Sequence, residues 1–422
     1  MWIRLPFVLA VGLPLVALRS PFPDTLQLFL ISFVAFGGAR GLELLARRTK
    51  FPSVIMIAAA VVALPLSILV RGKLEAPAQQ AVRPPIRVPK GKPERPVAPN
   101  EILPGRWAAV SLGESEGAAI AAADGVVHIW NARPTSYEPI ERTPAPIAGT
   151  AGSSKVSVGF NHSCALRGGV ALCWGWNYHG EIGRPSKGTH DRADAPVLAE
   201  VPHGVTFIDV SAGTGHTCGV DTDGAVWCWG ANQYGECGAK PAPEIKPLRV
   251  AELPASVAVR AGFHATCALT ADHRVMCWGD REFGGNGSST TVFGETPQVV
   301  TGDMQVVDFD LGQKGGCAID AAGDVTCWGS GASPARLHVD GGVDIAGGDY
   351  HHCVARRDGG VVCWGRNWYG QLGDGSRRDS SQPVVVRGVS GVRALAAGMN
   401  DACAIDGEGV LVCWGRFDHG RL

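Results

Sequence analysis

The stretch HTCGVDTDGAVWCWGANQYGECG, residues 216–238, decides the fold, because it joins two short segments of alternating pattern through a turn and ends in a glycine-flanked arm. The alternation over 218–221 and 225–228 favours two β-strands. A three-residue loop connects them, and Gly224 at its end adopts a left-handed backbone without steric cost. Counting outward from this loop places Cys218 directly opposite Cys228.

The same unit recurs along the chain at the interval of a propeller blade. Successive first cysteines are separated by 54, 49, 50, 36 and 50 residues. A further copy without cysteines covers 113–131, where we expect Ala118 and His128 at the two cysteine positions. The chain is therefore predicted to be all-β, a seven-bladed β-propeller over 96–422. Its six cysteine pairs are Cys164 with Cys173, Cys218 with Cys228, Cys267 with Cys277, Cys317 with Cys327, Cys353 with Cys363, and Cys403 with Cys413.

Three roles are open to the paired cysteines. Facing positions of an antiparallel pair have α-carbons about 4.5 to 5.5 Å apart, a separation that allows a disulfide. Small buried hydrophobes are the alternative. Metal binding would add the nearby histidines, but other residue types replace them in the remaining units, so we predict disulfides, no metal and no cofactor. These histidines are His162, His216 and His351.

The odd cysteine has a different setting. Cys237 occupies the position of Ile182 and Leu372 in the arm that follows Cys-Trp-Gly. We therefore predict a packed, unreactive thiol there.

The repeated pattern resembles the regulator of chromosome condensation repeat family. It reads Gly-x-x-His-x-Cys-Ala-Leu, a turn, Cys-Trp-Gly-x-Asn-x-x-Gly-Gln-Leu-Gly and then Pro-x-x-Val, most fully at 159–183, 213–238 and 348–373. The resemblance implies a seven-bladed propeller over about 96–422. The unit that begins at Cys317 departs from the pattern because it lacks the Gly-Gln-Leu-Gly arm.

The ends of the propeller are predicted to complete one blade together. The chain stops at 416–422, before a last Pro-x-x-Val strand. Pro96 to Gly113 spans 17 residues, as Pro196 to Gly213 does, so we expect 96–99 to supply the missing strand. Closure of this kind removes an exposed sheet edge.

Residues 1–73 are predicted to be a membrane anchor with one to three transmembrane helices. The uncharged run 51–70 is long enough to cross a bilayer, whereas 5–18 and 25–39 are shorter, and the first of these could instead be a signal peptide. Residues 74–95 form a Pro-rich, basic spacer. The basic residues within 40–50 should stay cytoplasmic, which puts the propeller on the periplasmic or extracellular side, where disulfides are stable; Arg71 and Lys73 argue the other way.

Charge excludes one class of partner. Residues 1–100 carry a net charge of +9 and residues 101–422 a net charge of −10. The phosphate backbone would repel an acidic propeller, so we predict no nucleic-acid binding.

No catalytic motif is present, and we predict that the protein is not an enzyme. The recurring tryptophans are expected to pack between blades or, alternatively, to line a binding surface. The glycines are interpreted as turn residues. Candidate contact residues stand near the roots of variable loops: Tyr178, Tyr234, Trp368, Tyr369, Arg377 and Arg378.

Three functions follow from these features. The first is a membrane-anchored binding module for a protein or a surface polymer. The second is inhibition or regulation of an exported enzyme, which the resemblance implies through the family's β-lactamase inhibitor. The third is guanine nucleotide exchange on a small GTPase, an activity of the same family that requires a cytosolic propeller. Photoreception, another activity in the family, is disfavoured because its Gly-Trp-Arg-His-Thr motif is absent.

Overall fold

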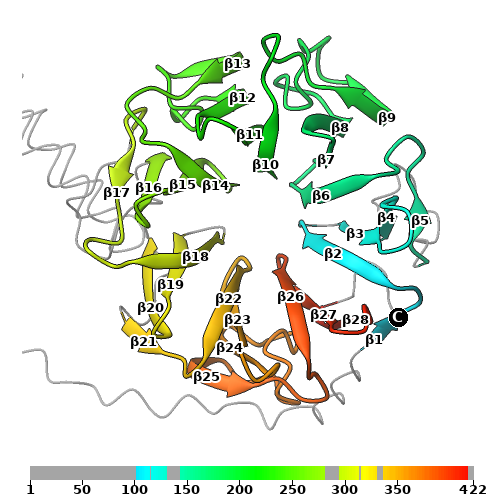
Figure 1. Cartoon of the computed structure of the whole chain (residues 1–422), viewed down its shortest axis with the longest axis vertical. Coiled ribbons are helices and arrows are strands. Elements are labelled where there is room, and N and C mark those ends of the chain that lie inside the picture. Colours follow the sequence, from blue (N-terminus) through cyan, green and yellow to red (C-terminus); the bar gives the residue numbers. More distant parts are fainter. Residues whose placement is uncertain are drawn as a thin grey trace, which may run out of the picture. The chain divides into compact units, whose positions relative to one another are not determined.

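The computed structural model describes residues 101–114, 116–130, 143–280, 294–312, 315–329 and 336–416. Within these ranges the chain forms seven four-stranded antiparallel sheets arranged around an axis (Figure 1). The predicted all-β, seven-bladed propeller is confirmed. The predicted anchor and spacer lie outside the described residues, and among those described no helix is long and apolar enough to span a bilayer.

Each blade has four strands, numbered here from the axis outward. The first strands are β2 (Trp107–Leu112), β6 (Ser153–Val158), β10 (Phe207–Ala212), β14 (Ser256–Ala261), β18 (Val306–Leu311), β22 (Gly342–Gly347) and β26 (Val392–Ala397). The second are β3 (Gly117–Ala121), β7 (His162–Arg167), β11 (His216–Asp221), β15 (Ala265–Thr270), β19 (Gly315–Asp320), β23 (His351–Arg356) and β27 (Asp401–Asp406). The third are β4 (Val127–Trp130), β8 (Val170–Trp176), β12 (Val226–Asn232), β16 (Val275–Gly279), β20 (Asp324–Gly329), β24 (Val361–Gly365) and β28 (Leu411–Gly415). The fourth are β5 (Ala145–Pro146), β9 (Arg192–Leu198), β13 (Ala242–Arg249), β17 (Gln298–Val299), β21 (Arg336–His338), β25 (Ser380–Val385) and, for blade 7, β1 (Glu101–Leu103).

The cysteines of each pair face one another across the second and third strands, as the loop count predicts. Each pair is joined as a disulfide with α-carbons 4.0 to 4.1 Å apart. The loop glycine Gly224 has a φ of 79°. In blade 4, His273 stands at this loop position instead of glycine and has a φ of 64°. Both residues of the shorter Gly168–Gly169 turn have positive φ, which keeps the first pair in register.

Blade 1 corrects one prediction. Ala118 stands at the first cysteine position, but its partner is Ile129, and His128 pairs with Ala119. The turn is one residue longer than in blades 3 to 7, since Ile120 pairs with Val127 whereas Val220 pairs with Val226. The prediction of His128 at the second cysteine position was therefore wrong, and Ile129 stands there.

An N-terminal strand closes the ring, as expected, but later in the sequence than predicted. Glu101 pairs with Cys413 and Leu103 with Leu411, so β1 completes blade 7. The predicted closing residues 96–99 lie outside the described residues. The connection from β1 to β2 is shorter than that from β9 to β10. The 17-residue spacing taken from Pro196 to Gly213 therefore placed the closing strand too early in the sequence.

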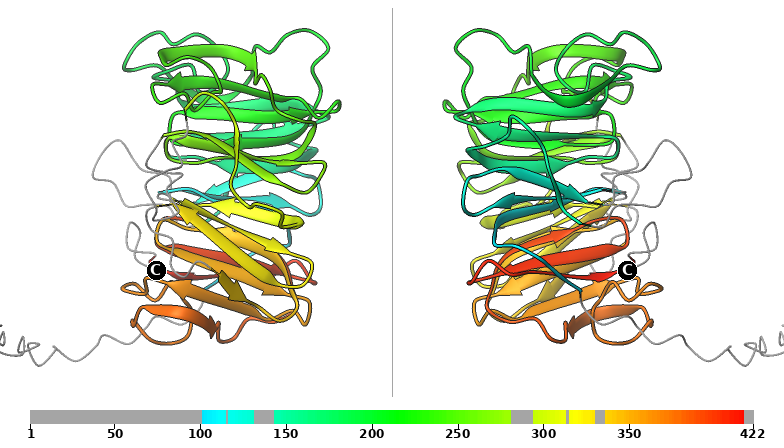
Figure 2. Two further views of the ribbon diagram at one scale, coloured as in Figure 1. Left: turned by 90° about the vertical axis from the view of Figure 1, so that its left-hand side faces the viewer. Right: turned by 90° about the vertical axis from the view of Figure 1, so that its right-hand side faces the viewer.

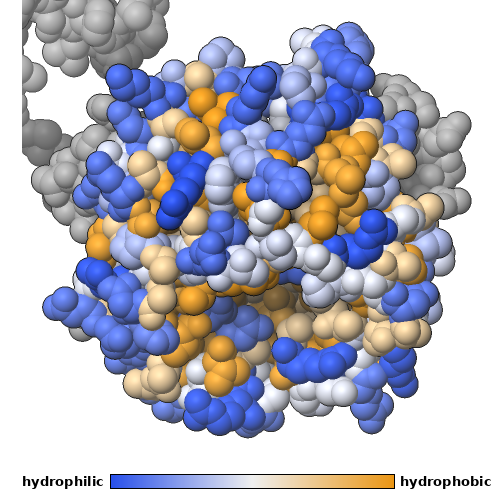
Figure 3. Space-filling model, turned by 45° about the horizontal axis from the view of Figure 1, so that its top comes forward, coloured by the Kyte–Doolittle hydropathy of each residue, from blue (hydrophilic) through white to orange (hydrophobic). Residues whose placement is uncertain are grey.

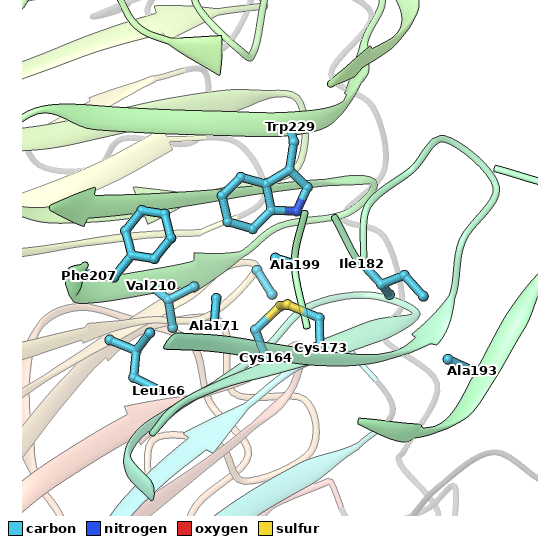
Figure 4. Close-up of a cluster of buried hydrophobic side chains, with 11 residues drawn as sticks. Cys164, Leu166, Ala171, Cys173, Ile182, Ala193, Ala199, Phe207, Val210 and Trp229 are labelled. Atoms are coloured by element: carbon cyan, nitrogen blue, oxygen red, sulfur yellow. A yellow bond between two sulfur atoms is a disulfide. The ribbon is translucent and has the colours of Figure 1, made fainter. Parts of the chain in front are cut away.

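Aromatic and aliphatic side chains fill the seams between blades. Figure 4 shows one such cluster, in which Trp229 and Phe207 of blade 3 pack with the Cys164–Cys173 disulfide of blade 2. Trp229 and Trp278 are fully buried. The recurring tryptophans thus pack between blades, the first of the two predicted alternatives.

Side-chain oxygens accept hydrogen bonds from backbone amides at the inner edge of the ring. Ser157 accepts a hydrogen bond from Ala212 N at 2.9 Å, and Asp209 accepts one from Val259 N at 2.9 Å. In both cases the acceptor belongs to the preceding blade. Amides that would otherwise be unpaired at a sheet edge are thereby bonded around the axis.

Two faces follow from the strand directions (Figure 2). The arm face carries the turns between first and second strands and the connections between third and fourth strands. The bulge face carries the remaining connections and takes its name from a one-residue register shift near the start of every first strand.

A ring of glycines ends the first strands at the arm face. A Cβ added to Gly159 would lie 2.2 Å from Gly213 O, and one added to Gly113 would lie 2.2 Å from Gly159 O. These glycines lie in the turns between first and second strands, as interpreted from the sequence, and they also allow neighbouring backbones to approach closely. The ring comprises Gly113, Gly159, Gly213, Gly262, Gly312, Gly348 and Gly398.

Candidate binding face

An asparagine fixes each complete arm on the arm face. Asn232 is fully buried, its Oδ1 accepts the Cys237 amide at 2.7 Å, and its Nδ2 donates to Ala239 O at 3.1 Å. Asn177 and Asn367 make the equivalent bonds to Ile182 and Leu372. The side chain holds both ends of the arm, which explains why Asn follows Cys-Trp-Gly in these units.

Cys237 behaves as predicted for a packed thiol. It is fully buried, and its Sγ donates to Ala231 O at 3.2 Å. Burial, and secondarily the Glu236 carboxylate, raises the pKa of the thiol well above its ordinary value. The thiolate needed for reactivity is therefore disfavoured.

A second polar residue of the arm orients the aromatic residue two positions before it. Glu236 Oε2 accepts the Tyr234 amide at 2.7 Å, and Gln371 Oε1 accepts the Tyr369 amide at 3.0 Å. Glu181 does the same for His179, and burial raises the pKa of Glu181 to about 7. The arms are thus rigid supports for exposed side chains.

The backbone of each arm also anchors the next blade. Glu181 O accepts hydrogen bonds from Thr217 Oγ1 at 2.8 Å and from Trp229 Nε1 at 3.0 Å. His162 Nε2 lies 2.7 Å from the same hydroxyl. Because that hydroxyl donates to the carbonyl, His162 must donate from Nε2, and burial lowers the histidine pKa to about 3. This histidine is structural and is neutral at neutral pH.

The first two predicted contact residues lie on this face in blades 2 and 3. Tyr178 stacks on Trp176 with ring centroids 4.9 Å apart, and Arg192 lies 5.6 Å from the Trp176 ring. Tyr234 is 44% exposed and packs against His264 with a centroid separation of 4.4 Å.

Blade 6 carries the next two, Trp368 and Tyr369. Trp368 is 57% exposed, and the Arg366 guanidinium lies 4.8 Å from its ring and 3.8 Å from that of Tyr350. Arg416 Nη1 donates to the Tyr369 hydroxyl at 3.1 Å. Cation–π contacts of this kind hold the planar groups in fixed orientations.

Arg377 and Arg378 extend this group into the loop before β25. Both are exposed, and Arg377 Nη1 donates to Trp368 O at 3.5 Å. Residues 178 and 234 therefore lie in blades 2 and 3, and the other four candidates lie in blade 6. The structure brings them to one face without joining them into a single cluster.

Sequence reasoning missed the cations that support the aromatic rings. Arg366 and Arg416 occupy the position directly after Cys-Trp-Gly, and Trp176 occupies the same position in blade 2. A comparison of that position between units would have found them.

The central opening on the arm face has a mixed chemical character. Next to the glycine ring, a cavity of about 130 Å³ is lined by Phe160 and Phe263 and by Glu114 and Asp349. Burial, and secondarily Glu114, raises the pKa of Asp349 to about 7. Its described lining contains no cysteine, serine, lysine or histidine.

Charged side chains link the first strands of blades 2 to 5. Arg260 contacts Asp209 at 3.5 Å, Asp308 at 3.8 Å and Asp310 at 3.5 Å, and Lys155 pairs with Asp209. Each of these aspartates also accepts a hydrogen bond from a backbone amide in the first strand of the next blade. A structural role therefore accounts for the network. Among the residues that the structure describes, no three His, Cys, Asp or Glu side chains are grouped to hold a metal ion.

Comparison with known proteins agrees with the fold. A model of the regulator of chromosome condensation (RCC1) repeat matches residues 168–220, 223–269 and 358–405, and a second model of this repeat matches 207–236, 257–284 and 343–371. The human E3 ubiquitin-protein ligase HERC2 is 29% identical over 261 residues, which cover 56% of this chain and 5% of HERC2. The probable human E3 ubiquitin-protein ligase HERC4 is 34% identical over 86 residues, covering 20% and 8%.

The chain spans less than a tenth of the length of these two ligases. Among solved structures, human WBSCR16 superposes with a TM-score of 0.62 at 19% identity, covering 74% of this chain and 88% of that one. At this identity the likeness concerns the fold alone.

Proposed function

Because the chain belongs to the regulator of chromosome condensation repeat family, we propose that it is a membrane-anchored, non-enzymatic binding module. Its propeller is presented outside the cytoplasmic membrane and recognises a protein or a surface polymer. The single observation that carries this proposal is the rigid support of exposed aromatic and arginine side chains on the arm face. Residues of these types dominate the binding energy of protein interfaces.

The anchor and the location rest on the sequence. The run 51–70 has the length and the lack of charge of a spanning helix, and the spacer separates it from the propeller. The six disulfides support an oxidising compartment, because thiols in the bacterial and eukaryotic cytosol are kept reduced.

Photo-crosslinking in the native membrane tests the binding role. A photoreactive amino acid at Trp368 should give a discrete crosslinked product on illumination of intact cells. The same amino acid at Val385, which is 59% exposed on an outer strand, should not. Equal products at both positions, or none at Trp368, would count against recognition through the arm face.

A protease added to spheroplasts, whose outer envelope is opened while the cytoplasmic membrane stays closed, tests the location separately. The propeller should be released from its spacer while a cytosolic marker stays intact. Protection of the propeller would instead favour intracellular roles, including nucleotide exchange on a small GTPase.

A further inference from the structure

The bulges in the first strands turn one residue of every blade toward the bulge face. In β10 the register shifts between Phe207 and Asp209, which leaves Ile208 unpaired, and the other six first strands shift at the equivalent place. A bulge of this kind re-aims a side chain. The seven unpaired residues are Ala108, Ser154, Ile208, Val257, Val307, Val343 and Arg393.

Four consecutive blades place a large aliphatic side chain at the bulge. Ile208 is 52% exposed, Val257 50%, Val307 42% and Val343 41%. Their strands β10, β14, β18 and β22 lie next to one another around the axis (Figure 1). We call these four residues the apolar arc. An oblique view shows apolar residues reaching the surface around the hollow at the centre of the propeller (Figure 3).

The residues at the other three bulges are not large aliphatic residues. Ala108 and Ser154 are small, and Arg393 donates from Nη2 to Trp107 O at 2.7 Å. The bulge itself therefore does not require an aliphatic residue. Isolated exposed aliphatic residues need no explanation, but the same exposed position filled by a large aliphatic residue in four consecutive blades indicates a contact surface.

The apolar arc is held rigidly. The residue before each bulge in blades 3 to 5 is buried and donates its amide to the hairpin turn of the preceding blade, as Phe207 N does to Gly169 O at 2.8 Å. Ser256 N and Val306 N make equivalent bonds at 2.8 and 2.9 Å. β-Branched side chains on such a frame lose little freedom on binding.

Carboxylates flank the apolar arc. The loops that enter blades 4, 5 and 6 expose Glu252, Asp303 and Asp340, each a few residues before the bulge. Of the cations in the neighbouring turns and loops, Arg167 donates to Gly149 O and Arg274 is paired with Asp272, whereas Arg249 and Arg357 are exposed. We call Glu252, Asp303 and Asp340 the rim. Together with the net charge of −10 over residues 101–422, the rim favours a cationic partner.

We propose that the bulge face over blades 3 to 6 docks a polypeptide segment that carries aliphatic side chains next to lysine or arginine. The inference rests on the proposed binding function and assigns it a second face and a partner chemistry. Aliphatic side chains of the segment pack on the apolar arc, and its cations pair with the carboxylates of the rim. Glu101 lies at the arm-face end of β1, so the chain enters the propeller away from this surface.

Binding of defined peptides to the purified full chain tests the proposal. The probes are fluorescent peptides of four Gly-Lys-Val, four Gly-Glu-Val or four Gly-Lys-Ser repeats, followed by anisotropy. The Gly-Lys-Val peptide should bind at least about tenfold more tightly than either of the others. The double variants Val257→Ser with Val307→Ser, and Glu252→Lys with Asp303→Lys, should each lose about tenfold of that affinity.

Matched controls use aliphatic residues of similar exposure on the outer strands. Leu198→Ser with Val385→Ser, at 60% and 59% exposure, should leave peptide affinity unchanged. A thermal melt of each variant establishes that it folds, and single substitutions replace any pair that does not. Equal affinity for the Lys and Glu peptides, or unchanged affinity in both apolar-arc and rim variants, would overturn the proposal.

The outcome also separates this inference from the proposed function. Loss of peptide binding in Arg366→Ala with Trp368→Ala, but not in the apolar-arc variants, would move recognition to the arm face and overturn only the inference. Binding to anionic lipid vesicles that the apolar-arc substitutions abolish would assign the surface to lipid and likewise overturn it. Absence of crosslinks at Trp368 in cells tells against the proposed function instead.

Discussion

The threonine before a disulfide cysteine links two groups by hydrogen bonds at the seam between blades 2 and 3. Thr217 Oγ1 donates to Glu181 O and accepts from His162, and Trp229 donates to the same carbonyl. Thr266 makes the corresponding bonds with His216 and Glu236. Both seams are therefore joined by buried polar contacts as well as by apolar packing.

Replacing this hydroxyl should weaken the seam. We predict that Thr217→Val lowers the free energy of unfolding by about 1 to 3 kcal/mol, because the His162 donor and the carbonyl are left without the shared partner. Denaturant unfolding measures the loss. Thr222→Val, at an exposed turn position, is the control and should change stability by no more than about 0.5 kcal/mol. Equal effects of the two substitutions would contradict the role of the hydroxyl.

A partly buried carboxyl in blade 7 should make stability depend on pH. Burial, and secondarily Asp349, raises the pKa of Asp401 from 3.8 to about 7. Folding thus favours the protonated carboxyl. The contribution of Asp401 to the free energy of unfolding is therefore present below pH 4 and is lost as the pH rises toward 7. We predict that Asp401→Asn gains on the order of 2 kcal/mol over wild type between pH 4 and pH 8.

Urea unfolding across that pH range checks the prediction. The low pKa of His162 acts in the opposite direction, since its contribution is present above pH 6.5 and is lost as the pH falls toward 3. The His162 contribution is the same in wild type and in Asp401→Asn, so it cancels from the difference between their stabilities. Asp223→Asn, at an exposed turn, serves as the control. Parallel stability profiles for Asp401→Asn and wild type would show the prediction to be wrong.

Residue pairs inside one hairpin could be predicted from the sequence, because loop length and the two-residue period determine which side chains face each other. Cys218 and Cys228 follow this rule. His128 did not, because one extra turn residue shifts the pairing to Ile129. The contacts of Thr217 join different blades, and no spacing within one unit predicts them.

Among the elements, the first strands depend most on glycine. Gly159 lies where the end of β6 meets the next blade, and an added Cβ would be 2.2 Å from Gly213 O. We predict that Gly159→Ala costs about 3 kcal/mol or more, because backbone must move to remove the contact. Gly294→Ala, where an added Cβ meets nothing within 4 Å, should be close to neutral.

Thermal melts of the two glycine variants provide the comparison. A Gly159→Ala protein as stable as Gly294→Ala would show that the ring of glycines is not needed for close approach. The bulges of the same strands, and hence the apolar arc, could not be predicted by counting from the hairpin loop, because that count fixes only the second and third strands.

Across the whole molecule, β1 ties the two ends of the propeller together. Leu103 is 5% exposed and packs with Leu411 and Cys413, whereas Ile102 is 66% exposed. We predict that Leu103→Ser lowers stability by about 2 to 4 kcal/mol and that Ile102→Ser changes it little. Calorimetric melts of both variants test closure, and a Leu103→Ser protein as stable as Ile102→Ser would contradict it.

A count of free thiols in the native protein tests the proposed display of the propeller outside the membrane. The protein is taken from its own membrane, denatured and alkylated with and without reduction, and its intact mass is determined. We predict one free thiol, Cys237, and six disulfides before reduction. Thirteen free thiols would place the propeller in a reducing compartment and contradict display outside the membrane.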